Sequence, residues 1–267
     1  MHFNRIAAIV LRQVYLLRGS VARIVPLFAW VAVDVLLWGF ISKYLNAIAS
    51  PGFNFVTVLL GAVLLADFFT RVMQGVTTAF LEDVWSRNFL NFFASPLSIG
   101  EYLSGLVVTS IGTSAIGLVV MLVLATGAFG LSFFAYGIAI VPFLIVLFLT
   151  GIAFGIAATA IVLRMGPASE WFVWPIPAML SPFAGVFYPI TTLPAGMQYI
   201  ARLLPLSYVF EGLRSVVAHG TFSGTMLLIG GCIAIVYVAL ACWLFVRVHR
   251  YAVRTGLIAR YSAESVS

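Results

Sequence analysis

The chain has 267 residues, of which 63% are hydrophobic and only 8% are charged, whereas globular proteins are about 45–50% apolar and about 25% charged. So few charged side chains cannot cover the surface of a water-soluble protein of this length, which excludes a soluble domain. The mean hydropathy of +1.14 indicates a polytopic membrane protein. The formal net charge of +6 is interpreted as a topology signal and not as affinity for nucleic acid.

Residues 1–20 are predicted to form an amphipathic helix in the membrane interface. At about 100° per residue, Arg5, Arg12 and Arg23 fall on nearly the same bearing, and apolar side chains occupy the opposite arc. That pattern indicates an apolar face in lipid and arginines that face the phosphates. The arginines also interrupt the stretch too often for a cleavable signal peptide. Two roles stay open, an anchor for the chain and an elbow that transmits motion to the first span.

Six membrane spans are predicted next, because a spanning helix needs about 20 predominantly apolar residues. They cover residues 24–45, 55–80, 103–127, 134–163, 171–188 and 225–247. No span shows the alternating pattern of a membrane barrel strand. We therefore expect an all-α integral membrane protein with a single transmembrane domain over residues 1–267, in which 24–247 form the six-span region and 248–267 a cytoplasmic tail.

The distribution of basic residues predicts the orientation of these spans. An even number of spans places both termini on one side, and that side holds ten of the fourteen basic residues against three on the other. Cytoplasmic flanks retain positive charge. Both termini are therefore predicted to be cytoplasmic.

The segment after the second span, residues 82–93, combines acidic and aromatic side chains. Glu82 and Asp83 suit a helix N-terminus, and Asp83 and Arg87 are spaced to pair on its surface. Aromatic side chains recur there at helical spacing: Trp85, Phe89 and Phe92. Two interpretations stay open. The segment is either an interfacial helix with its aromatics in the headgroup belt or a docking helix for a cytosolic partner.

Prolines concentrate in residues 175–205, which hold six of the eleven in the chain. The first three, Pro175, Pro177 and Pro182, predict that the short fifth span is kinked or broken. The stretch that follows is too apolar for a solvated loop and too interrupted to span. It is therefore predicted to form short re-entrant helices against protein in the outer leaflet.

Two blocks in this region carry a family resemblance. Residues 179–190 read MLSPFAGVFYPI, and residues 204–214 read LPLSYVFEGLR. They resemble the signature of type-2 ATP-binding-cassette (ABC) transporter permeases, in which a Ser-Pro…Gly-x-x-Phe/Tyr-Pro block closes the fifth helix and a Pro-Leu-x-Tyr-x-x-Glu-x-Leu-Arg block follows an apolar hairpin. The stretch from Phe92 to Glu101 is similar to the segment that follows the coupling helix in that family.

The resemblance implies a role for each unusual segment. Residues 1–20 would be the connecting helix, 82–93 the coupling helix in a groove of the nucleotide-binding subunit, and 189–215 the external gate helices. The implied coupling residues are Glu82, Asp83, Trp85, Arg87, Phe89 and Phe92. The implied residues of the translocation path or gate are Asp67, Arg71, Phe183, Tyr188, Pro189, Glu211 and Arg214. The path would lie between spans one, two and five.

The function that the resemblance implies is that of a permease subunit of an ATP-driven exporter. It would move an amphipathic or lipid-linked substrate, such as a glycan, a lipid or a hydrophobic drug, out of the cytoplasm or inner leaflet. Two copies of the chain would pair with two copies of an ABC ATPase in a bacterial inner membrane, in contact with membrane lipids.

The sequence predicts no catalysis in this chain. Lys43 is its only lysine, so a phosphate-binding loop of the form G-x-x-x-x-G-K-[ST] cannot exist, and ATP and Mg would be bound by the partner. Two cysteines in one apolar run and three scattered histidines predict neither a disulfide framework nor a metal site. Motifs of intramembrane hydrolases are absent from the sequence.

Charged side chains inside the spans leave an alternative open. Asp67 and Arg71 are spaced to pair within one helix, which offsets the cost of several kcal/mol for a charge in hydrocarbon. They are either a structural pair or part of the path. Asp34 has no local partner and must face protein or water. An ion-coupled secondary transporter, the alternative function, would use these three residues as coupling-ion sites.

Overall fold

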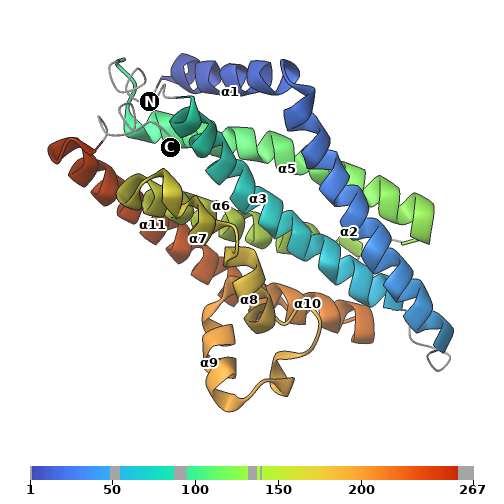
Figure 1. The fold of residues 1–267 in the computed structure, drawn as a ribbon. Helices are drawn as coiled ribbons and strands as arrows, with labels where there is room; N and C mark the ends of the chain where they lie inside the picture. Colours follow the sequence, from blue (N-terminus) through green and yellow to red (C-terminus); the bar gives the residue numbers. More distant parts are fainter. Residues whose placement is uncertain (1, 49–54, 87–94, 132–136, 139, 258–267) are drawn as a thin grey trace.

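The computed structural model of the protein describes residues 2–48, 55–86, 95–131, 137–138 and 140–257. In these ranges the regular elements are all helices, and no strand is present (Figure 1), which confirms the predicted all-α class. The helices in chain order are α1 (Phe3–Arg18), α2 (Val21–Ile48), a π-helical turn (Val56–Leu60) that leads into α3 (Gly61–Trp85), α5 (Ile99–Phe129), α6 (Ile140–Met165), α7 (Glu170–Val173), α8 (Ile176–Ala184), α9 (Ala195–Leu203), α10 (Pro205–His219) and α11 (Gly224–Arg254).

Five stretches of helix are long and apolar enough to cross a membrane. They are Ala29–Ile48, Val56–Trp85, Ile99–Phe129, Ile140–Met165 and Gly224–Arg254, and they correspond to the first four and the sixth of the predicted spans. Each helix continues past the predicted C-terminal boundary, because hydropathy falls near the interface while the backbone hydrogen bonding continues. The described residues therefore confirm a multi-pass membrane protein.

The fifth predicted span, residues 171–188, is not one continuous helix. α7 ends at Val173 and α8 begins at Ile176, with Pro175 between them. α8 contains Pro182 and ends before Gly185, whose φ of 71° terminates the helix. A proline has no N–H to donate to the preceding turn. The predicted break is thus confirmed, and among the described residues five continuous helices, not six, are candidate membrane spans.

Side-chain contacts show that this broken segment still runs from one end of the bundle to the other. At its start, the Glu170 Oε2 atom accepts a hydrogen bond of 3.2 Å from Trp85 Nε1 at the end of α3. Beyond α8, Phe187 borders a cavity together with Leu45 and Phe55, near the end of α2 and before the start of α3. α7 and α8 therefore connect the same two ends as the continuous helices do.

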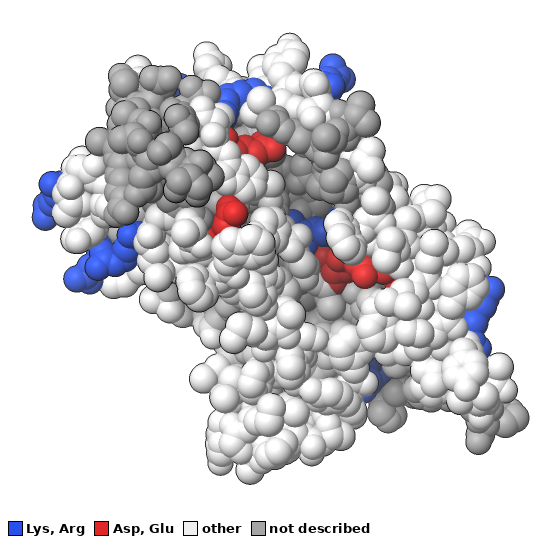
Figure 2. Space-filling view, in the orientation of Figure 1, with Lys and Arg blue, Asp and Glu red and all other residues white. Residues whose placement is uncertain are grey.

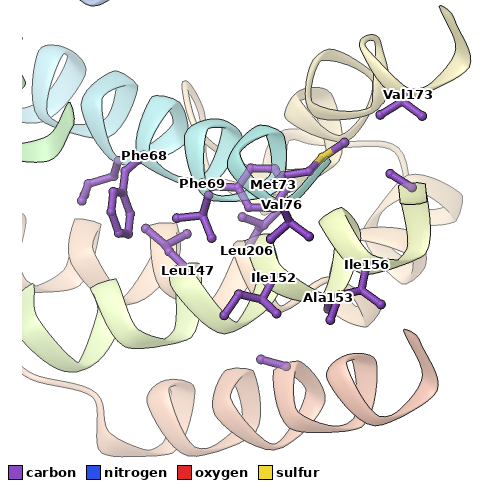
Figure 3. Packing of buried hydrophobic residues seen from close by; sticks show 14 of the residues in the cluster. Phe68, Phe69, Met73, Val76, Leu147, Ile152, Ala153, Ile156, Val173 and Leu206 are labelled. Carbon is purple, nitrogen blue, oxygen red and sulfur yellow. The ribbon is translucent and has the colours of Figure 1, made fainter. Parts of the chain in front are cut away.

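The main core lies where α3 packs against α6, with α11 on the far side of α6. Buried side chains of α3, among them Phe69 and Val76, face those of α6, among them Ile152 and Ile156 (Figure 3). These four side chains are at most 6% exposed. The packing holds α3, which carries the charged residues described below, along the centre of the bundle.

Two glycines of α6 allow this close approach. A Cβ atom on Gly151 would lie 2.7 Å from Val72 Cβ, and one on Gly155 would lie 2.8 Å from the backbone oxygen of Met73. Both distances are shorter than real side chains tolerate. The Gly-x-x-x-Gly spacing therefore acts as a packing motif between two membrane helices.

Replacing Gly155 by alanine is expected to force α3 and α6 apart, because the new methyl group would meet the Met73 backbone. We expect a loss of about 1–3 kcal/mol in the free energy of unfolding, as for an overpacked core, measured by thermal unfolding in nanodiscs. Gly112→Ala on α5 is the matched control, since nothing lies within 4 Å of a Cβ at Gly112. Equal midpoints for the two variants would contradict the packing role.

Candidate functional site

A cavity of about 410 Å³ lies among α2, α3, α8 and α10 and is called the central cavity below. Its polar wall residues are Asp34, Asp67, Thr70 and Ser181, and its aromatic ones are Trp38, Phe69, Trp174, Phe187 and Phe210. Figure 2 shows acidic and basic atoms close together in a hollow of this face. Among the described residues, no basic side chain belongs to the wall of the cavity.

The Asp67–Arg71 pair forms as its spacing predicts. Arg71 Nε lies 2.8 Å from Asp67 Oδ2, and the two side chains are 13% and 16% exposed. Arg71 packs toward α5, where a Cβ on Gly117 would lie 3.1 Å from Arg71 Cδ. Asp67 belongs to the wall of the central cavity. The pair therefore joins α3 to the α5 side of the bundle while it leaves Asp67 facing the cavity.

A second cavity, of about 290 Å³, lies beyond the first toward the end of α2. Three residues, Val186, Phe187 and Phe210, border both cavities. The Phe187 ring stacks on Trp38, with centroids 5.1 Å apart and planes at 21°. Phe187 therefore lies where the two cavities meet, with its ring held against Trp38 of the first cavity.

The predicted gate residues Glu211 and Arg214 form an ion pair that binds the chain after α8. Arg214 Nη1 lies 2.6 Å from Glu211 Oε1, and Arg214 Nη2 donates a 2.7 Å hydrogen bond to the Gly185 carbonyl. Glu211 Oε1 also accepts a 2.9 Å hydrogen bond from the Ile190 amide. The carbonyl and the amide belong to the stretch where the helix has ended, so they have no helical partner.

The other predicted gate residues lie in the same stretch. Ser207 Oγ donates a 3.1 Å hydrogen bond to the Phe183 carbonyl, and Tyr188 donates a 2.8 Å hydrogen bond to the Pro182 carbonyl. Pro189, at φ −63° and ψ 145°, is extended and turns the chain toward α9. The structure therefore gathers these residues around one break in the helix, while Asp67 and Arg71 lie on α3.

At the other end of the bundle, two arginines of α1 bind carboxylates of α3 and α5. Arg12 forms an ion pair with Asp83, which is fully buried, and Tyr102 donates a 2.7 Å hydrogen bond to Asp83 Oδ2. Arg5 Nη1 lies 3.3 Å from Glu101 Oε2. The amphipathic helix is thus confirmed, but the prediction that Arg5 and Arg12 face phosphates is wrong, because buried carboxylates bind them.

Close packing accompanies these ion pairs. Ile9 is 4% exposed and fills the space above Gly105, where a Cβ would lie 2.7 Å from Ile9 Cγ2. The Gln13 side chain donates a 3.3 Å hydrogen bond to the Ala79 carbonyl. α1 therefore sits on the adjoining ends of α3 and α5 as a packed element of the protein (Figure 1).

The predicted coupling residues at the end of α3 need a correction. Glu82, Asp83 and Trp85 belong to the last turn of α3, so the prediction that they begin a new helix is wrong. Carboxylates at a helix C-terminus oppose the helix dipole, and Arg12 offsets this for Asp83. Trp85 is 51% exposed. The proposed pairing of Asp83 with Arg87 and the roles of Phe89 and Phe92 concern residues 87–94, which lie outside the described residues.

Several residues of these sites had no distinguishing signal in the sequence. Arg12 and Asp83 are 71 positions apart, and Arg5 and Glu101 are 96 apart; no local spacing relates such pairs. Phe187 lies within the block of residues 179–190, but only the stacking on Trp38 distinguishes it from neighbouring aromatics.

The long apolar helices, with a cavity bordered by charged side chains among them, define the class as a helical multi-pass membrane protein. Over 96 residues, the chain is 30% identical to nodulation protein J of Rhizobium meliloti (strain 1021). The match covers 34% of this chain and 36% of that protein, so the chain spans about a third of the length of the relative it matches. No protein-family model matches the chain.

Loss of the Arg12 side chain should release α1. Arg12→Ala leaves the buried Asp83 carboxylate without its cationic partner, and breaking a buried pair in this way costs about 3–5 kcal/mol. We expect a lower unfolding midpoint and faster amide hydrogen exchange throughout α1. Arg18→Ala is the matched control, since Arg18 lies exposed in the last turn of the same helix. Exchange that rises equally in both variants would show that the ion pair does not hold α1.

Proposed function

We propose that the chain is the transmembrane permease subunit of an ATP-driven ABC exporter. Its substrate is an amphipathic or lipid-linked molecule that leaves the cytoplasm or the inner leaflet of a bacterial inner membrane. The observation that carries the proposal is the central cavity, whose wall combines α2, α3 and α8. These are the first, second and fifth membrane segments, between which the permease resemblance implies a path.

The packing of the two resemblance blocks supports the same function. Glu211 and Arg214 of the second block bind the backbone at Gly185 and Ile190 of the first. The blocks thus form one unit beside both cavities. The partial similarity to nodulation protein J is in keeping with a permease of the type-2 class.

The arrangement at the α1 end supports a site for a partner ATPase. The Trp85–Glu170 hydrogen bond joins the end of α3 to the start of α7 there, and the Arg164 guanidinium at the end of α6 lies 4.4 Å from the ring centroid of Tyr251 on α11. We assign this end to the cytoplasm, where basic residues predominate. Two copies of the chain would bind two ATPase subunits, which hold the ATP and Mg.

The ion-coupled secondary transporter stays the alternative because Asp34 and Asp67 both belong to the wall of the central cavity. In a secondary transporter, such carboxylates would bind the coupling ion near the middle of the membrane. The two functions differ in their source of energy, which an experiment separates directly.

Reconstitution into vesicles with and without the cognate ATPase tests the proposed function. The purified chain is expected to hydrolyse no ATP alone, and the combined subunits are expected to hydrolyse ATP and to export substrate in an ATP-dependent manner. An ATPase subunit with an inactivated phosphate-binding loop serves as the control. Transport by the chain alone in response to a proton or sodium gradient would contradict the exporter and support the secondary transporter.

Substitution of Trp85, the exposed aromatic residue at the end of α3, tests where the ATPase binds. Trp85→Ala is expected to weaken co-purification of the ATPase by about 2–4 kcal/mol, as for an aromatic at the centre of an interface, and Phe89→Ala is expected to do the same. Trp30→Ala is the matched control, since Trp30 is 65% exposed on a candidate membrane span. Unchanged co-purification and coupled hydrolysis in Trp85→Ala and Phe89→Ala would assign these aromatics to the headgroup belt.

A further inference from the structure

The charged side chains that border the central cavity are all acidic among the described residues. Two carboxylates, Asp34 and Asp67, belong to its wall. Asp67 is paired with Arg71 at 2.8 Å. Among the described residues, none gives the Asp34 side chain a hydrogen bond or an ion pair, and none of the wall residues is basic. Arg71 lies outside the wall, and its single positive charge acts on both Asp34 and Asp67. The cavity therefore presents two carboxylates to one cation, an excess of one negative charge.

A carboxylate in this position needs a partner. Asp34 lies within Ala29–Ile48, a candidate membrane span, and charged side chains at such depth pair with one another or face a polar cavity. Arg71 is already bound to Asp67 and its side chain packs toward Gly117 on α5. A ligand that brings positive charge into the cavity would supply what the wall does not.

The rest of the wall suits the same kind of ligand. Trp38 and Trp174 both border the cavity, and tryptophan faces attract cations more strongly than other aromatic side chains do. The remaining surface is mostly apolar, from Val63, Leu180 and Leu206 among others. A volume of about 410 Å³ lies within the range of about 300–1,000 Å³ found for small-molecule sites.

The geometry points to a substrate-binding site for amphipathic organic cations, with Asp34 as the counter-charge and Trp38 and Trp174 as the aromatic walls. This inference rests on the proposed function and narrows its substrate class to molecules that carry a protonated amine or another organic cation beside an apolar body. An anionic headgroup would meet the Asp34 carboxylate with no basic wall residue to bind it. Phe187, stacked on Trp38, would close the cavity on the side of the second cavity.

Two probes of the same shape and opposite charge test whether the site prefers a cation or an anion. Tetraphenylphosphonium is an amphipathic cation, and tetraphenylborate is an anion of the same shape. Equilibrium binding of each probe is measured on the full chain in nanodiscs, with binding to empty nanodiscs subtracted, because both ions partition into lipid. The wild-type chain is expected to bind the phosphonium at least tenfold more tightly than the borate.

Variants at Asp34 then assign the preference to one side chain. Asp34→Asn is expected to weaken phosphonium binding on the order of tenfold, because it removes a charge inside a low-dielectric cavity, whereas Asp34→Glu is expected to retain the preference. Glu170→Gln removes a carboxylate that does not border the cavity and is expected to bind like the wild type. Should Asp34→Asn fail to fold, the phosphonium-to-borate ratio of the wild type and of Asp34→Glu decides the question.

Equal binding of the two ions, tighter binding of the borate, binding of neither ion above empty nanodiscs, or an unchanged affinity in a folded Asp34→Asn variant would each overturn the cation site. The measurement needs no ATPase, so it is independent of the exporter proposal. Phosphonium binding without any ATPase-dependent export would contradict the exporter proposal and leave the cation site in place. ATPase-dependent export together with equal binding of the two ions would leave the exporter in place and contradict the cation site.

Discussion

A helix that breaks inside an apolar protein leaves backbone groups that must find partners, because hydrocarbon offers none. In this chain the Glu211–Arg214 ion pair supplies them, one residue for the Gly185 carbonyl and the other for the Ile190 amide. These two hydrogen bonds fix the chain just after α8. It thereby positions Val186 and Phe187, which stand between the two cavities. The cavity walls thus depend on two charged side chains of α10.

Hydropathy predicted most of the architecture because the signal for a membrane helix is a property of consecutive residues. The five long helices and the amphipathic α1 follow directly from run length and periodicity, and the break in the fifth segment follows from Pro175 and Pro182. The C-terminal boundaries were too early because α3 continues through Glu82 and Asp83, where hydropathy has already fallen.

Partners distant in the chain could not be predicted in the same way. The intrahelical pair of Asp67 and Arg71 was predictable from a spacing of four residues. The pairs of Arg12 with Asp83 and of Arg5 with Glu101 depend on how α1 folds back over α3 and α5. The family resemblance implied that Glu211 and Arg214 belong to the path or gate, which stays a prediction. Their hydrogen bonds to the broken segment depend on how α10 packs beside α8 and could not be predicted from spacing.

Glu101 serves two helices at once. Its Oε2 atom accepts from the Ser98 amide, which completes the capping box of α5, and lies 3.3 Å from Arg5 Nη1, while its Oε1 atom accepts from the His2 amide. Arg12, seven residues after Arg5, is about two helical turns away and binds Asp83 on α3. The chain length between Arg5 and Arg12 is therefore a fixed dimension of the protein. One residue inserted there would rotate one arginine by about 100° relative to the other, so that both could not keep their carboxylates.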